Sequence, residues 1–273
     1  MATATAAATP TAATEKILFR KEGAIGHVVF NNPEKYNAVS LEMWGAVEDV
    51  LADFAKDNSV RVAVLSGAGG KSFVSGADIS KFEKERGSAD AVRHYNARIK
   101  DVYEKVVAFP KPTIAMIDGF CLGGGLAFAV SCDLRFCSSK SKFGLPAARL
   151  GLGYPFEGLK RLVDTVGIGA ARDIVFSARR LDAAEAYNIG LVQKVLEASE
   201  LEAFVTNYAT TVAKNAPLTV ASLKFITGEI LKDPGERDMK KCHDMVAACF
   251  ASEDYIEGRT AFNEKREPRF KGR

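Results

Sequence analysis

The sequence predicts an α/β fold, with strand–strand–helix units in its N-terminal part and a helical C-terminal region. Three observations support this. Short apolar runs alternate with amphipathic segments through the front half of the chain. A glycine-rich stretch at 117–133 has the pattern of a strand, a turn and a buried helix. From Leu201 onward, helical periodicity replaces strands. The repeated units predict stacked right-handed turns with parallel strands.

In the front half, the chain begins with two short strands and a helix. Ser40 is a suitable N-cap for a helix that runs towards Phe54. Charged, helix-prone sequence fills 81–109 and ends before Pro110. Strands are expected at 17–21, 25–30, 60–66, 72–79, 113–117 and 134–137.

Helices dominate after residue 158. They are expected at 159–166, 170–176, 183–189, 201–214, 218–231, 236–251 and 255–267. The chain has no Pro- or Ser-rich linker between its mixed front and its helical back. The expected division is a disordered tail at 1–14, a core at 15–200 and a C-terminal helical region at 201–273.

Composition is that of an ordinary soluble globular protein. The 273 residues are 47% hydrophobic and 26% charged, with a net charge of +3, which is too small to indicate a nucleic-acid partner. The sequence has no run of about 18 apolar residues, so we expect no membrane partner. The opening residues lack the features of a secretory signal. Five cysteines without zinc-ligand spacing predict buried free thiols and a cytoplasmic location.

The glycine-rich stretch carries the first functional prediction. Three glycines at a strand-to-helix junction leave backbone N–H groups uncovered, at the positive end of the helix dipole. Such groups can stabilise developing negative charge, although a lone Gly-Gly-Gly is more often a packed structural turn. Neither a P-loop nor a dinucleotide-binding pattern is present.

Several motifs together resemble the crotonase (enoyl-CoA hydratase/isomerase) superfamily, over nearly all of 16–273. They occur in family order, which makes the set far more specific than any one motif. They are NPEKYNA at 32–38, FVSGADI at 73–79, GFCLGGG at 119–125, CD at 132–133, FGLP at 143–146, AAEAYNIGLV at 183–192 and AFNEKR at 261–266.

The resemblance implies a crotonase-like superhelix of ββα turns, with a helical C-terminal region that builds homotrimers or hexamers. It implies an acyl-CoA thioester as substrate and no cofactor besides the coenzyme A of that substrate. Two backbone N–H groups of the family stabilise an enolate or tetrahedral oxyanion, and they map to Ala77 and Gly124. Each such donor is typically worth about 10²–10³ in rate.

The resemblance also implies a coenzyme A site. Lys35 would lie near the adenine, the segment that ends at Ile79 would line the nucleotide, and Phe262 and Lys265 would approach it from a C-terminal helix. For the two lysines, an ordinary solvated role is the alternative. The full expected set for substrate and coenzyme A is Lys35, Ala38, Ser75, Ala77, Asp78, Ile79, Gly123, Gly124, Phe262 and Lys265.

No metal is expected. The histidines, His27, His94 and His243, are isolated from one another and take ordinary surface or core roles in this interpretation. Asp78 and Asp133 have the character of turn or cap residues.

One departure from the family matters most. Hydratases of the family use two glutamates, one two residues past Gly-Gly-Gly and one directly after Phe-Gly-x-Pro. This chain has Ala127 and Ala147 at those places. Loss of one acid/base group typically costs about 10²–10⁴-fold, so we expect that the protein is not a conventional two-glutamate hydratase.

Two other side chains are candidates for catalysis. Tyr154 matches a position where related decarboxylases and hydrolases have a tyrosine that faces the substrate, and a phenol is a donor at neutral pH. The histidine that decarboxylating relatives have at position 77 is, however, absent. Glu157 could act as a base if burial raised its pKa, and the alternative is that it faces solvent near a helix start. Arg149 could meet an acyl carboxylate, but a surface or subunit-interface role is favoured.

Three functions therefore remain open. The first is oxyanion-stabilised chemistry other than hydration: isomerisation, decarboxylation, thioester hydrolysis or carbon–carbon cleavage. The second is hydration in which Tyr154 or Glu157 substitutes for the glutamates, and the third is coenzyme A binding without turnover. The acyl group cannot be deduced, although Phe82 is a candidate for its pocket.

Overall fold

Two sheets form the centre of the protein, whose computed structural model describes residues 11–273, without the side chains of 11–13, 82 and 84. The larger sheet has the strand order β1-β2-β3-β4-β6-β8-β11 and is parallel from β3 onward. Its strands are β1 (Thr11–Thr14), β2 (Ile17–Glu22), β3 (Ile25–Phe30), β4 (Val62–Gly67), β6 (Thr113–Ile117), β8 (Leu134–Ser138) and β11 (Lys194–Leu196).

The smaller sheet has the order β10-β9-β7-β5. Strands β5, β7 and β9 are parallel, and β10 pairs antiparallel with β9. Its strands are β5 (Ser72–Val74), β7 (Phe120–Leu122), β9 (Lys142–Gly144) and β10 (Leu181–Asp182). Their brevity explains why β7, β9 and β10 were missed in the sequence, since two or three residues are too few to show strand alternation.

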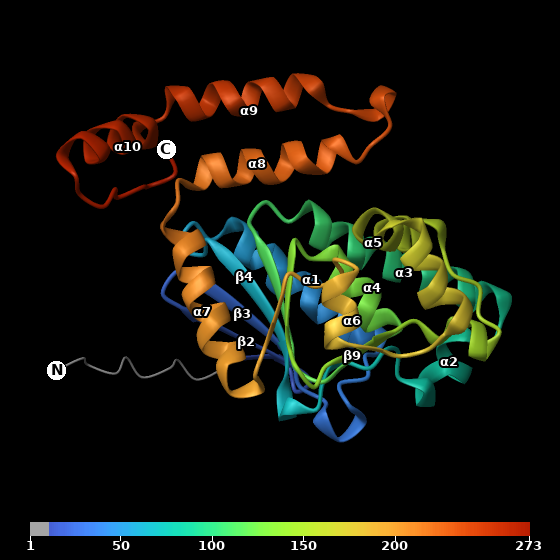
Figure 1. The fold of residues 1–273 in the computed structure, drawn as a ribbon. Helices are drawn as coiled ribbons and strands as arrows, with labels where there is room; N and C mark the ends of the chain where they lie inside the picture. Colours follow the sequence, from blue (N-terminus) through green and yellow to red (C-terminus); the bar gives the residue numbers. More distant parts are fainter. Residues whose placement is uncertain (1–10) are drawn as a thin grey trace.

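Helices cover the sheets and extend beyond them (Figure 1). The α-helices are α1 (Leu41–Lys56), α2 (Phe82–Arg86), α3 (Ala89–Ala108), α4 (Gly124–Ser131), α5 (Phe156–Ser177), α6 (Ala183–Asn188), α7 (Ala198–Lys214), α8 (Pro217–Ile230), α9 (Met239–Ala251) and α10 (Glu253–Glu264). The predicted cap of α1 is confirmed, because Ser40 Oγ accepts a hydrogen bond from the Met43 N–H. The two helices expected at 159–176 are one element, interrupted at Gly167, which has φ of 76°.

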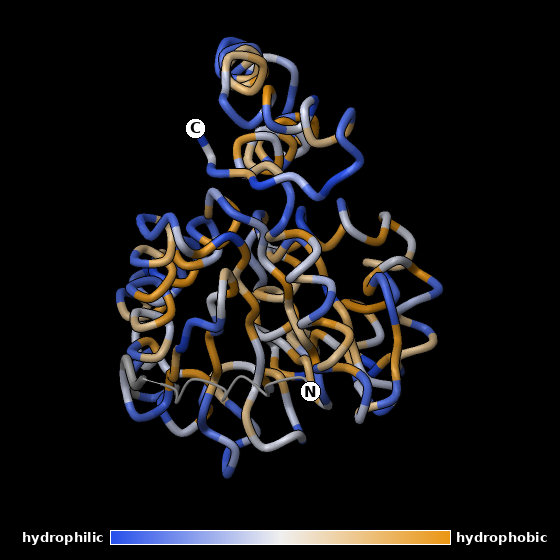
Figure 2. Tube along the Cα trace, turned by 90° about the vertical axis from the view of Figure 1, so that its left-hand side faces the viewer, coloured by the Kyte–Doolittle hydropathy of each residue, from blue (hydrophilic) through white to orange (hydrophobic). Residues whose placement is uncertain are grey.

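Both faces of the large sheet are buried, as is usual for parallel strands. On one side, Val64 and Phe136 pack against Leu201 of α7. On the other side lies the main core, where Trp44, Phe30 and Phe128 stack edge to face or tilted around the buried helix α4. Figure 2 shows hydrophobic segments gathered inside this body.

The C-terminal helices do not form one unit. Helix α7 packs on the large sheet, whereas α8, α9 and α10 lie outside the body in both ribbon and tube views (Figures 1 and 2). Helix α8 contacts the body through Lys224, whose Nζ lies 2.8 Å from Asp133 Oδ2. The packing therefore changes near Pro217, some way beyond the expected boundary at 201. None of the helices in the described part of the chain is long and apolar enough to span a membrane.

The expectation of a disordered tail at 1–14 needs correction for its last four residues. Thr11–Thr14 form β1, which pairs antiparallel with β2, and the rest of that tail lies outside the described residues. The edge of β2 offers backbone N–H and C=O groups, and the backbone of Thr11–Thr14 pairs with them.

His27 lies on β3, and its side chain is buried without a hydrogen-bond partner for Nε2 among the described residues. Burial lowers its pKa to about 4, and the charge of Arg20 adds to this effect. Glu22 Oε2 lies 3.7 Å from Nε2, too far for a hydrogen bond that would hold the proton.

We predict that the free energy of unfolding falls as pH drops from 6.5 towards 4. Between these pH values His27 is protonated in the unfolded chain but stays neutral in the folded chain, because its pKa is lower in the folded state. Protons therefore favour unfolding, and the free energy of unfolding at pH 5 is about 2 kcal/mol lower than above pH 6.5. Urea titrations at pH 7 and pH 5 measure the loss. The variant His27→Gln should lose less stability between these pH values, and His243→Gln, on the exposed face of α9, should match the wild type. Equal losses in His27→Gln and the wild type would contradict the prediction.

Candidate active site

The site begins at the first turn of α4. Gly123 precedes this helix with φ of 53°, and its N–H donates to the Gly144 carbonyl at 2.9 Å. The N–H of Gly124, the first helical residue, has no intrahelical acceptor because it belongs to the opening turn. Every residue from Gly125 to Ser131 is buried. The Gly124 N–H therefore lies at the end of a helix that is otherwise inside the apolar core.

Ala77 lies on the segment that follows β5. Val39 donates its N–H to the Gly76 carbonyl at 2.9 Å, and Asp78 donates to the Val39 carbonyl at 3.0 Å. In such a parallel bridge, the N–H of the residue between, here Ala77, points away from the Val39 strand. It is therefore available to another acceptor.

Glycines bring the two segments together. Gly76 has φ of 111°, and a Cβ built on it would lie 3.3 Å from the Leu122 carbonyl oxygen and 3.8 Å from the Gly124 nitrogen. A Cβ on Gly125 would lie 2.2 Å from the Val74 carbonyl oxygen. Only a glycine at 125 permits this close approach of α4 to β5. The two predicted N–H donors thus lie on adjacent segments.

The loop at 32–38 is hydrogen-bonded to the start of β5 and to the loop before it. Asn37 is fully buried with φ of 55°, and its Nδ2 donates to the carbonyls of Ala68 at 3.0 Å and Ser72 at 2.7 Å. Its Oδ1 accepts the N–H of Asn32 at 2.9 Å. A left-handed backbone at a buried asparagine is tolerated because these bonds compensate for the strain.

Lys35 and the segment after Ala77 are in direct contact. Lys35 Nζ lies 2.9 Å from Asp78 Oδ2 and 3.0 Å from Ser80 Oγ. Burial alone would raise the pKa of Asp78, but hydrogen bonds from Ser80 and Lys35 outweigh it and hold that pKa below its usual value. Ser75 binds the 35–36 backbone, donating its N–H to the Tyr36 carbonyl at 3.2 Å. Of the other predicted contacts, Ala38 is half-buried and the Ile79 side chain is 67% exposed.

Ala127 and Ala147 are the two positions where the resemblance implies glutamates in a hydratase. Ala127 is 3% exposed and belongs to the main core, while Ala147 is half-buried and packs against the same core. Neither side chain can accept or release a proton.

Phenols lie beside the start of α4 instead. Tyr103 Oη donates to the Gly124 carbonyl at 2.9 Å. Burial raises the pKa of Tyr103 well above its usual value, and neighbouring Tyr154 and Tyr95 add to this effect. Burial likewise raises the pKa of Tyr154, with a contribution from Tyr95. Of the described side chains, no carboxylate is among the groups whose charge shifts the pKa of Tyr103 or Tyr154.

Two arginines border these phenols. The Arg86 guanidinium lies 3.8 Å above the Tyr95 ring, and the charge of Arg161 acts on Tyr103. Sequence reasoning found Tyr154 but missed Tyr95, Tyr103 and both arginines. For the two tyrosines, the available indication was their spacing on α3, because positions eight apart lie about 80° apart around the helix axis and can share one broad buried face. No such indication existed for the arginines.

Glu157 is not in the buried environment that a catalytic base would need at this position. Its Oε1 lies 2.7 Å from Lys100 Nζ on the surface between α5 and α3. That hydrogen bond lowers the pKa of Glu157, whereas a base would need it raised. Arg149 lies on the exposed turn after β9, and the side chain of Phe82 lies outside the described residues.

The family model for enoyl-CoA hydratase/isomerase matches residues 20–273. The chain belongs to this family. It is 36% identical over 250 residues to a short-chain-enoyl-CoA hydratase of Clostridium acetobutylicum, covering 92% of this chain and 95% of the relative. It is 35% identical over 256 residues to a crotonyl-CoA hydratase of Syntrophomonas wolfei, covering 94% and 98%.

Solved structures of the family have the same fold. An enoyl-CoA hydratase/carnithine racemase from Magnetospirillum magneticum matches with a TM-score of 0.91 and 32% identity, covering 97% of each chain. A putative enoyl-CoA hydratase/isomerase family protein from Hyphomonas neptunium matches with a TM-score of 0.89 and 32% identity, covering 94% of this chain and 98% of that one. The predicted crotonase-like α/β fold is confirmed.

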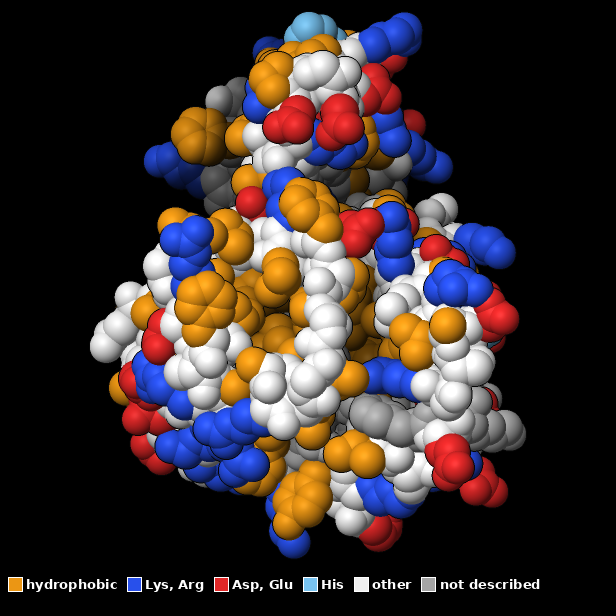
Figure 3. All heavy atoms as spheres, turned by 90° about the vertical axis from the view of Figure 1, so that its right-hand side faces the viewer, with side chains coloured by type: hydrophobic (Ala, Val, Ile, Leu, Met, Phe, Trp, Pro, Cys, Tyr) orange, Lys and Arg blue, Asp and Glu red, His pale blue; other side chains and the backbone are white. Residues whose placement is uncertain are grey.

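On the side that carries α2, α3 and α5, the surface of this family member is hollowed. Hydrophobic side chains line the hollow, and Lys and Arg side chains gather on the surface around it (Figure 3). In the described part of the chain, no cluster of three or more His, Cys, Asp or Glu side chains is arranged to hold a metal ion.

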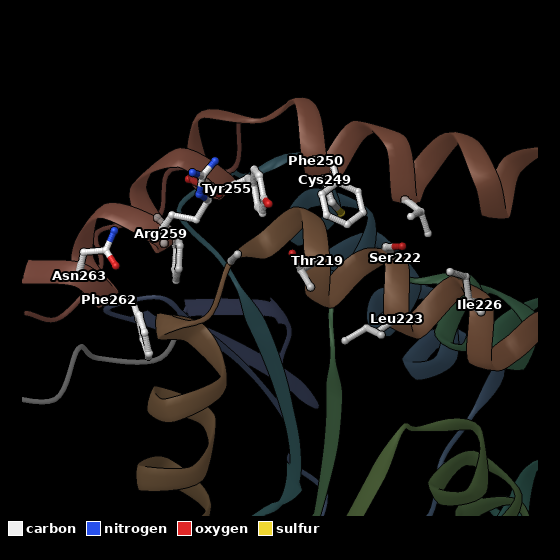
Figure 4. A pocket seen from close by; sticks show the side chains of 15 residues that line it. Thr219, Ser222, Leu223, Ile226, Cys249, Phe250, Tyr255, Arg259, Phe262 and Asn263 are labelled. Atoms are coloured by element: carbon white, nitrogen blue, oxygen red, sulfur yellow. The ribbon is translucent and has the colours of Figure 1, made fainter. Parts of the chain in front are cut away.

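Phe262 and Lys265 lie elsewhere. Phe262 is 84% exposed on α10, beside the apolar space between α8, α9 and α10 (Figure 4), and Lys265 follows at the end of that helix. Helix α10 and helix α2 are at opposite sides of the chain (Figure 1). Within one chain, the structure therefore does not bring these two residues to Lys35 and Ile79.

We predict that Gly125→Ala destabilises the protein by about 2–3 kcal/mol, because the new methyl group meets the Val74 carbonyl and forces α4 away from β5. Urea denaturation followed by circular dichroism gives the difference. Gly228→Ala is the matched control, since a Cβ there meets nothing within 4 Å and replaces glycine in a helix. The control should be as stable as the wild type or slightly more stable, and an unchanged Gly125→Ala would contradict the packing described here.

Proposed function

We propose that this family member forms a thioester enolate by breaking a carbon–carbon bond at C2 of an acyl-CoA, and not by two-glutamate hydration. The coenzyme A of the substrate is the only cofactor in this proposal. The N–H groups of Ala77 and Gly124 stabilise the enolate oxygen. Two observations support this assignment of the donors: the segments of Ala77 and Gly124 approach closely, and the Ala77 N–H points away from Val39. Two such donors account for about 10⁴-fold or more in rate.

The observation that carries the proposal is the chemistry of the side chains around Gly124. Hydration needs a base to activate water, and isomerisation needs a base to remove a C2 proton. Ala127 and Ala147 cannot serve, and the raised pKa of Tyr154 keeps its phenol protonated at neutral pH. The site therefore offers donors without an acceptor.

A reaction that suits such a site makes the enolate without proton abstraction. In decarboxylation, the bond between C2 and the substrate carboxylate breaks, carbon dioxide leaves, and the electron pair moves into the thioester carbonyl. The phenol of Tyr154 then donates a proton to C2 of the enolate. Solvent afterwards reprotonates the Tyr154 phenolate. Cleavage of a 3-oxoacyl chain by attack of water at C3 also breaks a carbon–carbon bond at C2 and leaves an enolate, but it needs an activated water.

Arg161 supports an acyl group that carries a carboxylate. Its guanidinium makes no hydrogen bond or ion pair within the described part of the chain, although Glu104 and Glu157 act on it from a distance. Burial lowers the pKa of Arg161, which marks a cation with reduced access to water. An anionic substrate group would be its natural partner.

A second candidate function is slow hydration, favoured by the names of relatives at 35–36% identity, which are hydratases. Glu157 would then have to leave Lys100 and act as the base. Its lowered pKa makes it a weak one.

The deciding experiment compares acyl-CoAs by mass spectrometry. Malonyl-CoA and methylmalonyl-CoA report carbon dioxide loss, acetoacetyl-CoA reports cleavage, and crotonyl-CoA reports hydration. We expect decarboxylation to exceed crotonyl-CoA hydration by at least about 100-fold in kcat/KM, since two acid/base groups are absent. Efficient hydration would contradict the proposal, and binding of coenzyme A without any turnover would favour a non-catalytic role.

We predict that Tyr154→Phe lowers kcat by about 10²-fold and changes KM by less than about twofold, because the phenol acts on the reacting carbon and not on coenzyme A. Steady-state kinetics with the preferred substrate measure both. The control is Tyr187→Phe, whose ring is 54% exposed on α6. If kcat were unchanged in Tyr154→Phe, the proton would come from elsewhere.

We also propose that α8–α10 mediate assembly into homotrimers or hexamers in the cytoplasm. These helices expose Phe250 and Phe262, which are 63% and 84% exposed and line a cavity of about 830 Å³ (Figure 4). Ile256 of α10 is 64% exposed as well. Free thiols that are mostly buried suit a reducing compartment. Light scattering of the intact protein measures the assembly, and a monomer would contradict it.

A further inference from the structure

The small sheet has an outer face that the proposed reaction does not use. Cys121, Phe143 and Leu181 lie opposite or next to one another on β7, β9 and β10 and are at most 1% exposed. Because side chains alternate along a strand, the neighbours of these three residues point the other way. Those neighbours include Phe120 and Lys142, which are paired in register, and Arg180, which directly precedes β10.

A pocket of about 700 Å³ lies at this place. That size is typical of a small-molecule site. Its lining residues are Tyr36, Gly70, Lys71, Gly119, Phe120, Lys140, Lys142 and Arg180.

The pocket has an excess of positive charge. Lys140 is neutralised by Asp118 at 3.1 Å and donates to the Gly70 carbonyl at 2.8 Å. Lys71, Lys142 and Arg180 make no salt bridge or side-chain hydrogen bond with the described residues. Three unpaired cations around one concave surface repel one another and concentrate the field, so they favour an anion with more than one charge.

The pocket also has an aromatic wall. The rings of Tyr36 and Phe120 meet edge to face with centroids 5.9 Å apart, and the Arg180 guanidinium lies 5.2 Å from the Phe120 ring centre. Tyr36 is 48% exposed, so its ring is accessible to a ligand. Aromatic rings and a guanidinium plane both stack on flat heterocycles.

The pocket is separate from the proposed coenzyme A and oxyanion site along the sheet. Lys71, Phe120 and Lys142 lie at or before the first residues of β5, β7 and β9. The residues that we assign to the thioester, Ala77 and Gly124, follow the last residues of β5 and β7. The two places are therefore at opposite ends of parallel strands.

We propose that this pocket is a second binding site, for a nucleoside phosphate: a planar ring against Tyr36 and Phe120, with its phosphates held by Lys71, Lys142 and Arg180. A ligand there would contact the 33–38 loop through Tyr36, next to Lys35. The site is thus placed to influence coenzyme A binding without sharing its residues.

Isothermal titration calorimetry of the intact protein with ADP tests the proposal, in the absence and presence of saturating coenzyme A. We expect ADP to bind in both conditions, and to bind at least about tenfold more weakly when NaCl rises from 50 to 300 mM, since several charge contacts are lost to counterions. If coenzyme A displaces ADP competitively, the pocket belongs to the coenzyme A site and the proposal is wrong. Absence of ADP binding overturns it as well.

Variants assign the two halves of the site. Lys142→Ala and Arg180→Ala should each weaken ADP binding at least tenfold and leave acyl-CoA turnover unchanged, whereas Lys240→Ala, an exposed lysine of α9, should change neither. Inorganic pyrophosphate tests the ring: we expect it to bind at least tenfold more weakly than ADP, with Phe120→Leu removing that difference. Equal binding of pyrophosphate and ADP by the wild type would contradict a site for a planar ring.

Discussion

The contact between β5 and the first turn of α4 is the constraint on which the rest of the site depends. A residue with a Cβ at position 125 would collide with the Val74 carbonyl, so glycine there determines how closely the two segments lie. The loop at 32–38 strengthens this arrangement from the other side, because buried Asn37 binds the Ser72 carbonyl at 2.7 Å. Short parallel strands then bring the segments of Ala77 and Gly124 together, so that both proposed donors are backbone N–H groups.

Backbone donors have a practical advantage over side chains at such a site. They are held by the fold itself, so they lose no conformational entropy when the charge develops. The acid/base side chains beside them can change without disturbing that geometry. We propose that Ala127 and Ala147 are two such changes. Buried Tyr103, which donates to the Gly124 carbonyl, and half-buried Tyr154 both have raised pKa values. This combination supports chemistry in which the enzyme donates hydrogen bonds and a proton but does not remove one.

Much of the fold could be predicted from the sequence, because long amphipathic helices have clear periodicity and a buried strand such as 25–30 is a short, mostly apolar run after a turn. The resemblance to the family assigned Gly124 and Ala77 as donors, and the structure brings their segments together. The short strands β7, β9, β10 and β11 could not be found, since alternation needs more residues than they have. Tyr95 and Tyr103 were missed because tyrosines on a helix resemble ordinary core residues, and only the structure shows the Gly124 carbonyl next to Tyr103. Glu157 was considered as a base because sequence does not show its partner, Lys100.

The central claim is that the site stabilises an enolate but has no base to form one by proton removal. Hydrogen–deuterium exchange at C2 of butyryl-CoA in D₂O tests it most directly, with mass spectrometry as the readout. Butyryl-CoA has no carboxylate at C2 to lose and no double bond to hydrate, so exchange reports only a base acting with the oxyanion donors. Our account predicts binding of butyryl-CoA without enzyme-dependent exchange. Exchange that is fast in the wild type and lost in Glu157→Gln would contradict it, and would identify the base that we consider absent.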